Sequence, residues 1–199
     1  RDMGVVIEGP QQGNVTVHGV GLHGLKAPAG PLYMGNSGTS MRLLSGLLAA
    51  QSFDTELSGD ASLSKRPMNR VAKPLREMGA VIETGADGRP PLRIKGGQRL
   101  SGMHYDMPMA SAQVKSCLLL AGLYAQGETS VTEPAPTRDH TERMLRGFGA
   151  ELTVEETPQG RIIAIRGEAE LKPQQITVPG DPSSAAFWMV AASIVPGSD

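Results

Sequence analysis

Basic residues stand at the starts of two expected helices, where a positive charge is unfavourable. Arg66 directly precedes a helix expected at 67–78, and Arg138 lies in the first turn of another expected at 137–148. The free N–H groups and the dipole of a helix already make its N-terminus positive, so an anion held there would explain the arginines. The alternative is ordinary surface charge, with Arg138 paired to Glu142 one turn along the helix. The arginines therefore indicate either an anion site or solvated charges.

Small polar residues open the other expected helices. The segment 35–40 reads Gly-Asn-Ser-Gly-Thr-Ser, and its Gly38 would let the backbone approach a phosphate or carboxylate closely. Ser111 and Gln113 stand at the start of the next apolar run and can orient a polyol or a phosphate. The alternative is that both loops do no more than cap their helices. The glycine spacing is not that of a P-loop.

Other familiar signatures are missing from the sequence. The four histidines have no metal-ligand spacing, and the single cysteine, Cys117, falls inside an apolar run, where a thiol is ordinarily structural. A formal net charge of −1 gives no overall field for nucleic acid. One cysteine excludes an internal disulfide, and no apolar run reaches the length of a membrane span. The sequence therefore predicts a cytoplasmic protein without a metal site.

Short segments recur along the chain with a period of roughly 70–75 residues, which is too long for a small solenoid repeat. The segments 1–5, 76–80 and 146–150 resemble one another, and each precedes a β-rich pair, a loop of small polar residues and an apolar run. This pattern predicts a duplicated α/β unit with two strand–helix steps per copy. In this register Arg1 corresponds to a helix end and 197–199 to the residues before a strand. The sequence is therefore expected to be a piece of a longer protein, cut at both ends.

Two kinds of helix are expected from the distribution of charge. The helices at 41–50, 114–125 and 185–195 are apolar nearly all round, and a helix that is apolar on every face is buried on every face. The helices at 67–78 and 137–148 carry charge on one side, as the strands do. The predicted fold class is therefore α/β, with central helices and outer sheets.

Alternation and turn residues place the remaining elements. Pro74 lies inside the helix at 67–78 and is expected to kink it. The expected strands are 5–7 with 14–17, 81–83 with 91–95 and 152–155 with 161–166 as hairpins, together with 53–57 and 129–133.

Taken together, the loops resemble those of the EPSP synthases, the 3-phosphoshikimate 1-carboxyvinyltransferases, in order and spacing. Two blocks, 109–116 and 137–142, look most like the bacterial class II enzymes of that family. The resemblance covers essentially all 199 residues. The segments that carry it are 35–43, 59–68, 109–116, 137–142 and 179–184.

The resemblance implies two domains, each built from three copies of a βαβαββ unit with helices inside and sheets outside. Residues 1–178 would form most of the shikimate-3-phosphate-binding domain, and 179–199 the crossover and first helix of the second domain. That last helix would lack its native partners here, and would be loosely placed or buried against a second copy of the chain. The implied partners are small anionic substrates and the second domain of the same polypeptide, with no nucleic acid and no membrane.

The resemblance also implies the chemistry. EPSP synthases transfer the enolpyruvyl group of phosphoenolpyruvate to shikimate-3-phosphate through a tetrahedral intermediate and release phosphate, a step of the shikimate pathway of aromatic amino acid biosynthesis. They use no metal or organic cofactor, and glyphosate occupies their phosphoenolpyruvate pocket. The acid–base groups are expected outside this chain, which by itself would be inactive. The implied contacts are Ser111, Ala112, Gln113 and Arg138 for shikimate-3-phosphate, and Gly38, Arg66 and Gln113 for phosphoenolpyruvate.

Two other functions stay open at this point. The sister enolpyruvyl transferase acts on UDP-N-acetylglucosamine and typically uses a loop cysteine, whereas Cys117 falls in an expected helix. A non-catalytic anion-binding or assembly domain would share the sites at the helix starts but would lack turnover. The gene around both ends of the sequence discriminates the two classes, since a downstream repeat with aspartate, lysine and arginine would make the protein an enzyme.

Overall fold

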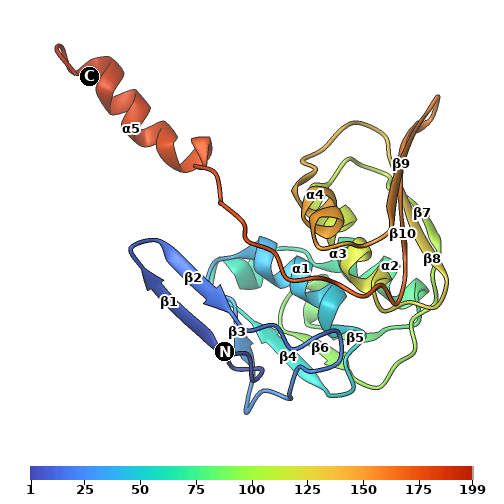
Figure 1. The fold of residues 1–199 in the computed structure, drawn as a ribbon. Helices are drawn as coiled ribbons and strands as arrows, with labels where there is room; N and C mark the ends of the chain where they lie inside the picture. Colours follow the sequence, from blue (N-terminus) through green and yellow to red (C-terminus); the bar gives the residue numbers. More distant parts are fainter. Residues whose placement is uncertain (199) are drawn as a thin grey trace.

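The computed structural model describes residues 1–198 and contains two copies of one βαβαββ unit (Figure 1). In each copy, two strand–helix steps are followed by a hairpin. The first copy consists of β3 (Leu32–Tyr33), α1 (Gly38–Leu48), β4 (Thr55–Ser58), α2 (Asn69–Glu77), β5 (Val81–Thr84) and β6 (Leu92–Lys95). The second consists of β7 (His104–Asp106), α3 (Ala112–Gly122), β8 (Glu128–Glu133), α4 (His140–Gly147), β9 (Leu152–Thr157) and β10 (Gly160–Arg166).

Each copy folds its four strands into one sheet, and the two sheets have the same strand order. The orders are β3-β4-β6-β5 and β7-β8-β10-β9. In both sheets the first pair of strands is parallel and the other two pairs are antiparallel. The duplicated α/β unit predicted from the repeat is therefore confirmed. Sequence analysis did not find β7, a strand of three residues whose ends, His104 and Asp106, are exposed and polar.

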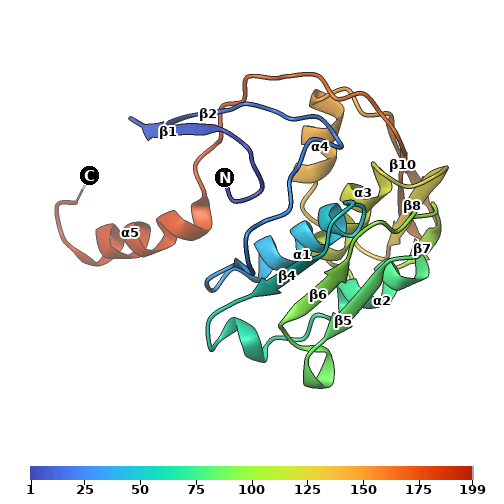
Figure 2. The ribbon, with the colours of Figure 1, turned by 90° about the horizontal axis from the view of Figure 1, so that it is seen from below.

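Helices α1 and α3 pack against each other at the centre of the molecule (Figures 1 and 2). No residue from 40 to 51 or from 111 to 125 is exposed. Gly46 lets the two backbones approach closely, because a Cβ there would overlap the carbonyl oxygen of Cys117. The prediction that the first two apolar helices are buried is confirmed.

Most strands of the two four-stranded sheets, and helices α2 and α4, show one buried and one exposed face. In β6, Leu92 and Ile94 are buried whereas Arg93 and Lys95 are exposed. Such alternation is typical of a sheet with one face in water. Helix α2 continues past Pro74 as a single helix and buries only one side. The sheets therefore lie outside and the apolar helices inside, as predicted.

Helix α5 (Pro182–Ile194) contradicts the prediction that the third apolar helix is buried on every face. It has no buried residue, and Phe187 and Trp188 are 81% and 79% exposed. It stands apart from the two units at the end of an extended segment (Figure 1). An all-apolar helix is buried only where a partner surface exists, and residues 1–198 provide α5 with none.

Two further differences concern the ends of the chain and the helix starts. Strands β1 (Ile7–Gln11) and β2 (Asn14–Val17) form a separate two-stranded hairpin, which begins two residues later than predicted. Helix α2 begins two residues after the predicted start because a short 3-10 turn, η1 (Leu63–Lys65), precedes it. Helix α4 begins three residues after its predicted start. None of the described helices combines the length and apolarity needed to cross a membrane.

Candidate functional site

Serine residues cap both central helices. The Ser37 Oγ accepts a hydrogen bond from the N–H of Ser40 at 3.1 Å, and the Ser111 Oγ accepts one from the N–H of Val114 at 3.3 Å. These bonds satisfy donors that a helix start leaves free. The capping interpretation of the two loops is therefore correct as far as it goes. Capping does not account for the arginines that surround the start of α1.

Three arginines, here called the arginine cluster, gather near the start of α1: Arg42, Arg66 and Arg70. A Cβ added to Gly38 would lie 3.2 Å from Arg42 Nη1 and 3.3 Å from Arg66 Nη1, so both guanidinium groups lie against this residue. Burial, and then the charges of Arg70 and Arg66, lower the pKa of the Arg42 guanidinium. Within residues 1–198, none of the three forms an ion pair. Unneutralised positive charge at a helix N-terminus attracts an anion.

Asp60 orders the loops around Arg66 without neutralising the arginine directly. Its Oδ1 accepts a hydrogen bond from the N–H of Leu63 at 2.7 Å, and its Oδ2 accepts one from Asn36 Nδ2 at 2.8 Å. The Leu63 N–H, followed by the Asn36 side chain, lowers the pKa of the Asp60 carboxyl. Asn36 Oδ1 in turn accepts a hydrogen bond from Arg66 Nη2 at 2.7 Å. Asn36 therefore lies between Arg66 and Asp60 and orients the guanidinium group, and the Asp60 carboxylate does not contact Arg66 directly.

Gln113 joins the start of α3 to the arginine cluster. Its Oε1 accepts a hydrogen bond from Arg42 Nη1 at 2.6 Å, and its Nε2 donates one to Thr39 Oγ1 at 2.8 Å. Arg42 Nη2 also donates to the carbonyl of Pro67 at 3.2 Å, whereas its buried Nε has no hydrogen-bond partner. Arg42 is only 9% exposed, and its guanidinium is held in one position by hydrogen bonds to two other segments of the chain.

Arg138 lies in the connection between β8 and α4 and is exposed. The hydroxyl groups of Ser116 on α3 and Thr141 on α4 are 2.8 Å apart, so the first turn of α4 lies beside α3. The Arg138 side chain itself forms no hydrogen bond or ion pair within residues 1–198. Arg138 is therefore placed near α3 by the residues that follow it in the chain, of which Thr141 contacts α3.

The predicted site residues thus fall into two groups. Gly38, Arg66 and Gln113 are brought together through Arg42, and Ser111 and Ala112 adjoin Gln113 at the start of α3, partly buried. Arg138 belongs to a second group on the α4 side, and no contact joins it to Arg66.

The interpretation of Arg138 as half of a helical ion pair is wrong. Glu142 contacts the buried Lys115, with Oε1 and Nζ 2.5 Å apart. Arg138 precedes α4 rather than lying in it. Neither Thr137 nor Asp139 makes a side-chain cap on this helix.

Arg70 and Asp60 were missed by sequence analysis, although one of them carried a signal. Arg70 lies in the first turn of the expected helix that Arg66 precedes, so the positive end of that helix carries two like charges, which is unfavourable unless an anion lies between them. Asp60 carried no comparable signal, because its role depends on a contact with Asn36 from a distant loop.

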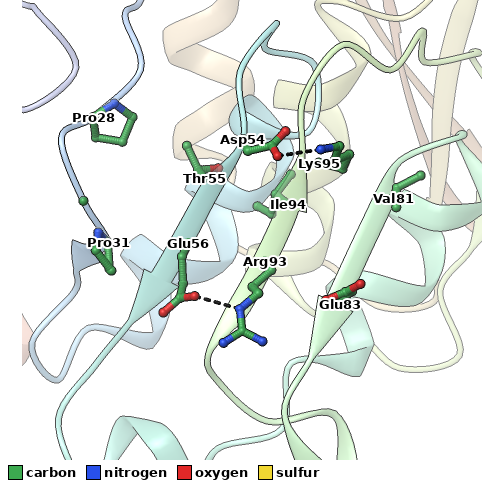
Figure 3. A pocket seen from close by; sticks show the side chains of 11 residues that line it. Pro28, Pro31, Asp54, Thr55, Glu56, Val81, Glu83, Arg93, Ile94 and Lys95 are labelled. Atoms are coloured by element: carbon green, nitrogen blue, oxygen red, sulfur yellow. Dashed lines mark hydrogen bonds and ion pairs between the residues drawn. The ribbon is translucent and has the colours of Figure 1, made fainter.

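A hollow of about 500 Å³ lies elsewhere, on the outer face of the β4-β6-β5 sheet (Figure 3). Four of its five charged side chains pair with one another: Lys95 Nζ lies 2.7 Å from Asp54 Oδ2, and Arg93 Nε lies 2.8 Å from Glu56 Oε2. The fifth is a carboxylate, Glu83. Because both cations of the hollow are exposed and already paired, the hollow lacks the unpaired positive charge that distinguishes the arginine cluster.

Comparison with known proteins decides the family. The family model described as EPSP synthase (3-phosphoshikimate 1-carboxyvinyltransferase) matches residues 1–199. The chain belongs to the EPSP synthase family. The resemblance inferred from the loop motifs is therefore confirmed.

Relatives and solved structures agree with this assignment. The chain is 66% identical over 199 residues to a 3-phosphoshikimate 1-carboxyvinyltransferase of Alkalilimnicola ehrlichii. The matched region includes all of this chain and 44% of that protein. It is 64% identical to the Methylococcus capsulatus protein of the same name, of which it covers 45%. An EPSP synthase structure from Acinetobacter baumannii superposes with a TM-score of 0.89 at 66% identity, covering 97% of this chain and 43% of that one. The chain thus spans less than half the length of these relatives.

Proposed function

We propose that this chain provides the shikimate-3-phosphate-binding part of an enzyme that transfers the enolpyruvyl group of phosphoenolpyruvate to shikimate-3-phosphate. Residues 1–178 form most of that domain, and 179–199 form the crossover to a second domain and its first helix. Family membership supports the reaction, and the two βαβαββ units support the domain. The exposed apolar surface of α5 supports its assignment to a partner domain.

The arginine cluster is the observation that carries this proposal. Phosphoenolpyruvate and shikimate-3-phosphate are both anions, and the three arginines have no carboxylate partner within residues 1–198. Phosphoenolpyruvate would lie over Gly38, where the absent side chain leaves room between backbone and guanidinium groups. Arg66 would bind its charge, and Gln113, which Arg42 fixes, would contact both substrates.

Shikimate-3-phosphate would lie at the start of α3. The free N–H groups there, the Ser111 hydroxyl and the Gln113 amide supply donors, while Ala112 leaves space for the sugar-like ring. Arg138 would bind the phosphate from the α4 side in a bidentate contact. In this arrangement the residues of this chain bind and align the two substrates, which lowers the entropic barrier to their reaction.

This chain performs no acid–base step in the proposal. A substrate hydroxyl adds to the enolpyruvyl double bond and phosphate then leaves, and both events require proton transfers. The groups that perform them belong to the part of the family fold beyond these residues. The arginine cluster contributes by offsetting the charge of the departing phosphate.

Cys117 argues against the alternative substrate UDP-N-acetylglucosamine. It is fully buried within α3, and burial raises the pKa of its thiol to about 12. A thiol of this kind stays protonated and does not act as a nucleophile or an acid in a mobile loop.

Calorimetry and phosphate release test the proposal. The 199-residue chain is expected to bind shikimate-3-phosphate weakly and to release no phosphate, and the full-length product of the gene is expected to release phosphate with both substrates. UDP-N-acetylglucosamine in place of shikimate-3-phosphate is expected to give no reaction. A full-length product that binds shikimate-3-phosphate without turnover would support a non-catalytic anion-binding protein instead.

A further inference from the structure

Four charged side chains form a closed ring under the connection between β8 and α4. Lys115 Nζ lies 2.9 Å from Glu133 Oε2 and 2.5 Å from Glu142 Oε1. On the other side, Arg161 Nη1 lies 2.9 Å from Glu133 Oε1 and Nη2 lies 3.5 Å from Glu142 Oε2. Each carboxylate therefore faces both cations, and an exposed third carboxylate, Glu156, lies with its Oε1 3.0 Å from Arg161 Nε. We call these four residues the charge ring.

The charge ring is unusually buried for a group of ions. Lys115 and Glu133 are 0% exposed, Glu142 is 2% exposed and Arg161 is 19% exposed. Buried ion pairs rarely add stability compared with apolar residues of the same size, because desolvation offsets their attraction. They do impose one relative placement on the elements that carry them. Here those elements are α3, β8, α4 and β10.

The placement of the ring bears directly on Arg138. Glu133 is the last residue of β8 and Glu142 lies in the first turn of α4, so both ends of the connection that carries Arg138 are bound to Lys115. Thr137, the residue before Arg138, donates a hydrogen bond from Oγ1 to Glu133 Oε2 at 2.7 Å. Lys115 itself follows Gln113 by two residues, on the helix that begins with the predicted substrate contacts.

We infer that the charge ring and Thr137 are positioning residues, which fix Arg138 relative to Ser111 and Gln113 so that one phosphorylated ligand can contact both. The inference rests on the proposed binding of shikimate-3-phosphate. None of the ring residues contacts the ligand. The ring residues hold the connection between β8 and α4 at a set distance from α3. The hydrogen bond from the Thr137 hydroxyl to Glu133 then fixes the backbone next to Arg138.

Thr137→Val removes the transmitting hydroxyl and keeps the shape and the ring. In the full-length gene product, the dissociation constant for shikimate-3-phosphate is expected to rise about tenfold, the scale of one hydrogen bond to a charged group. The KM for phosphoenolpyruvate and the midpoint of thermal unfolding are expected to change little. The 31P resonance of bound shikimate-3-phosphate is expected to move towards its value in free solution. Thr137→Ser, which restores the hydroxyl, is expected to restore affinity and resonance together.

Thr157→Val is the matched control. The Thr157 hydroxyl donates to the carbonyl of Gly160 at 2.7 Å and accepts from the N–H of Gln159 at 3.3 Å, in the turn between β9 and β10. This variant therefore loses a partly buried threonine hydroxyl's bonds to neutral backbone groups, on a segment that does not carry Arg138. Unchanged affinity in Thr157→Val alongside weakened affinity in Thr137→Val supports the inference. Wild-type affinity in Thr137→Val overturns it while leaving the proposed function intact. Failure of the unmodified protein to bind shikimate-3-phosphate overturns both.

Discussion

Helices α1 and α3 begin in the same way but treat charge oppositely. Each has 11 residues and a serine cap. Counted from the capping serines, Met41 and Lys115 occupy the same position, and both are fully buried. In α1 the buried position is apolar and the cations gather outside it, whereas in α3 a cation fills it and two glutamates meet the charge.

The difference is one between paired and unpaired charge. In the charge ring each cation faces two carboxylates, and Arg161 also pairs with the exposed Glu156. The arginine cluster is incomplete, since three cations share one region and burial and mutual repulsion lower the pKa of Arg42. Within residues 1–198 the three arginines form no ion pair, and the Asp60 carboxylate, whose pKa the Arg66 charge helps to lower, is linked to Arg66 through Asn36. We therefore expect the counter-charge there to come from a ligand.

The largest expected effect comes from giving α3 the residue that α1 has. Lys115→Met would leave Glu133 and Glu142 buried with only Arg161 to meet their charges. The free energy of unfolding is expected to fall by about 3–5 kcal/mol, which is typical of breaking a buried ion pair from one side. Urea unfolding followed by circular dichroism measures the change.

Lys95→Met is the control for this variant. Lys95 pairs with Asp54 at 2.7 Å, but both side chains are largely exposed, so little change in stability is expected. If Lys115→Met unfolds at the same urea concentration as the unmodified protein, the stability of the fold does not depend on the charge of Lys115. The proposed difference between the buried positions of α1 and α3 would then be wrong.

Removing a cation from the arginine cluster is expected to affect binding rather than folding. Arg66→Gln should raise the KM for phosphoenolpyruvate in the full-length gene product by about 10- to 100-fold, the scale of losing one or two charge-assisted hydrogen bonds. The midpoint of thermal unfolding should stay constant or rise, because Arg42 and Arg70 lose a like charge. Arg93→Gln, on the outer sheet, is the matched control and should leave the KM unchanged. A destabilised Arg66→Gln protein with normal KM would make the cluster structural.

The smallest expected effect comes from a single methyl group. In Gly38→Ala the new Cβ would lie 3.2 Å and 3.3 Å from the two guanidinium groups, which must move by a few tenths of an ångström. The half-inhibitory concentration of glyphosate should rise by about tenfold, and more than the KM for phosphoenolpyruvate, because the inhibitor is the longer ligand. Gly30→Ala, where nothing lies within 4 Å of the added atom, is the control. Equal inhibition of Gly38→Ala and the unmodified enzyme would show that the ligand does not lie over this residue.

Local pattern was sufficient to predict much of the fold. The repeat indicated two copies of one unit, and all-round apolarity identified α1 and α3 as central. The same signal was wrong for α5, because apolarity states that a helix needs a partner without stating where the partner is. The start of α4 was also misplaced, since Thr137 is held outside the helix by a carboxylate four residues back, a contact that no periodicity shows.

Candidate site residues could be proposed from sequence where they lie at a helix start, but not where their role depends on a distant contact. Gly38, Ser111 and Gln113 could be proposed because small and polar residues before an apolar run are unusual locally. The role of Arg42 depends on Gln113, which is 71 residues away in sequence. The role of Lys115 could not be predicted either, because it depends on Glu133 and Glu142, which lie 18 and 27 residues further along the chain.

The contact between Gly46 and Cys117 sets a dimension of the molecule far from where it lies. Gly46 follows Gly38 by eight residues, about 12 Å along the helix axis. The missing side chain there determines how closely α1 and α3 approach, and so how far Thr39 stands from Gln113. That distance is short enough for Gln113 Nε2 to donate a hydrogen bond to Thr39 Oγ1 at 2.8 Å. A side chain at position 46 would move the two helices apart and break this bond without touching either of its partners.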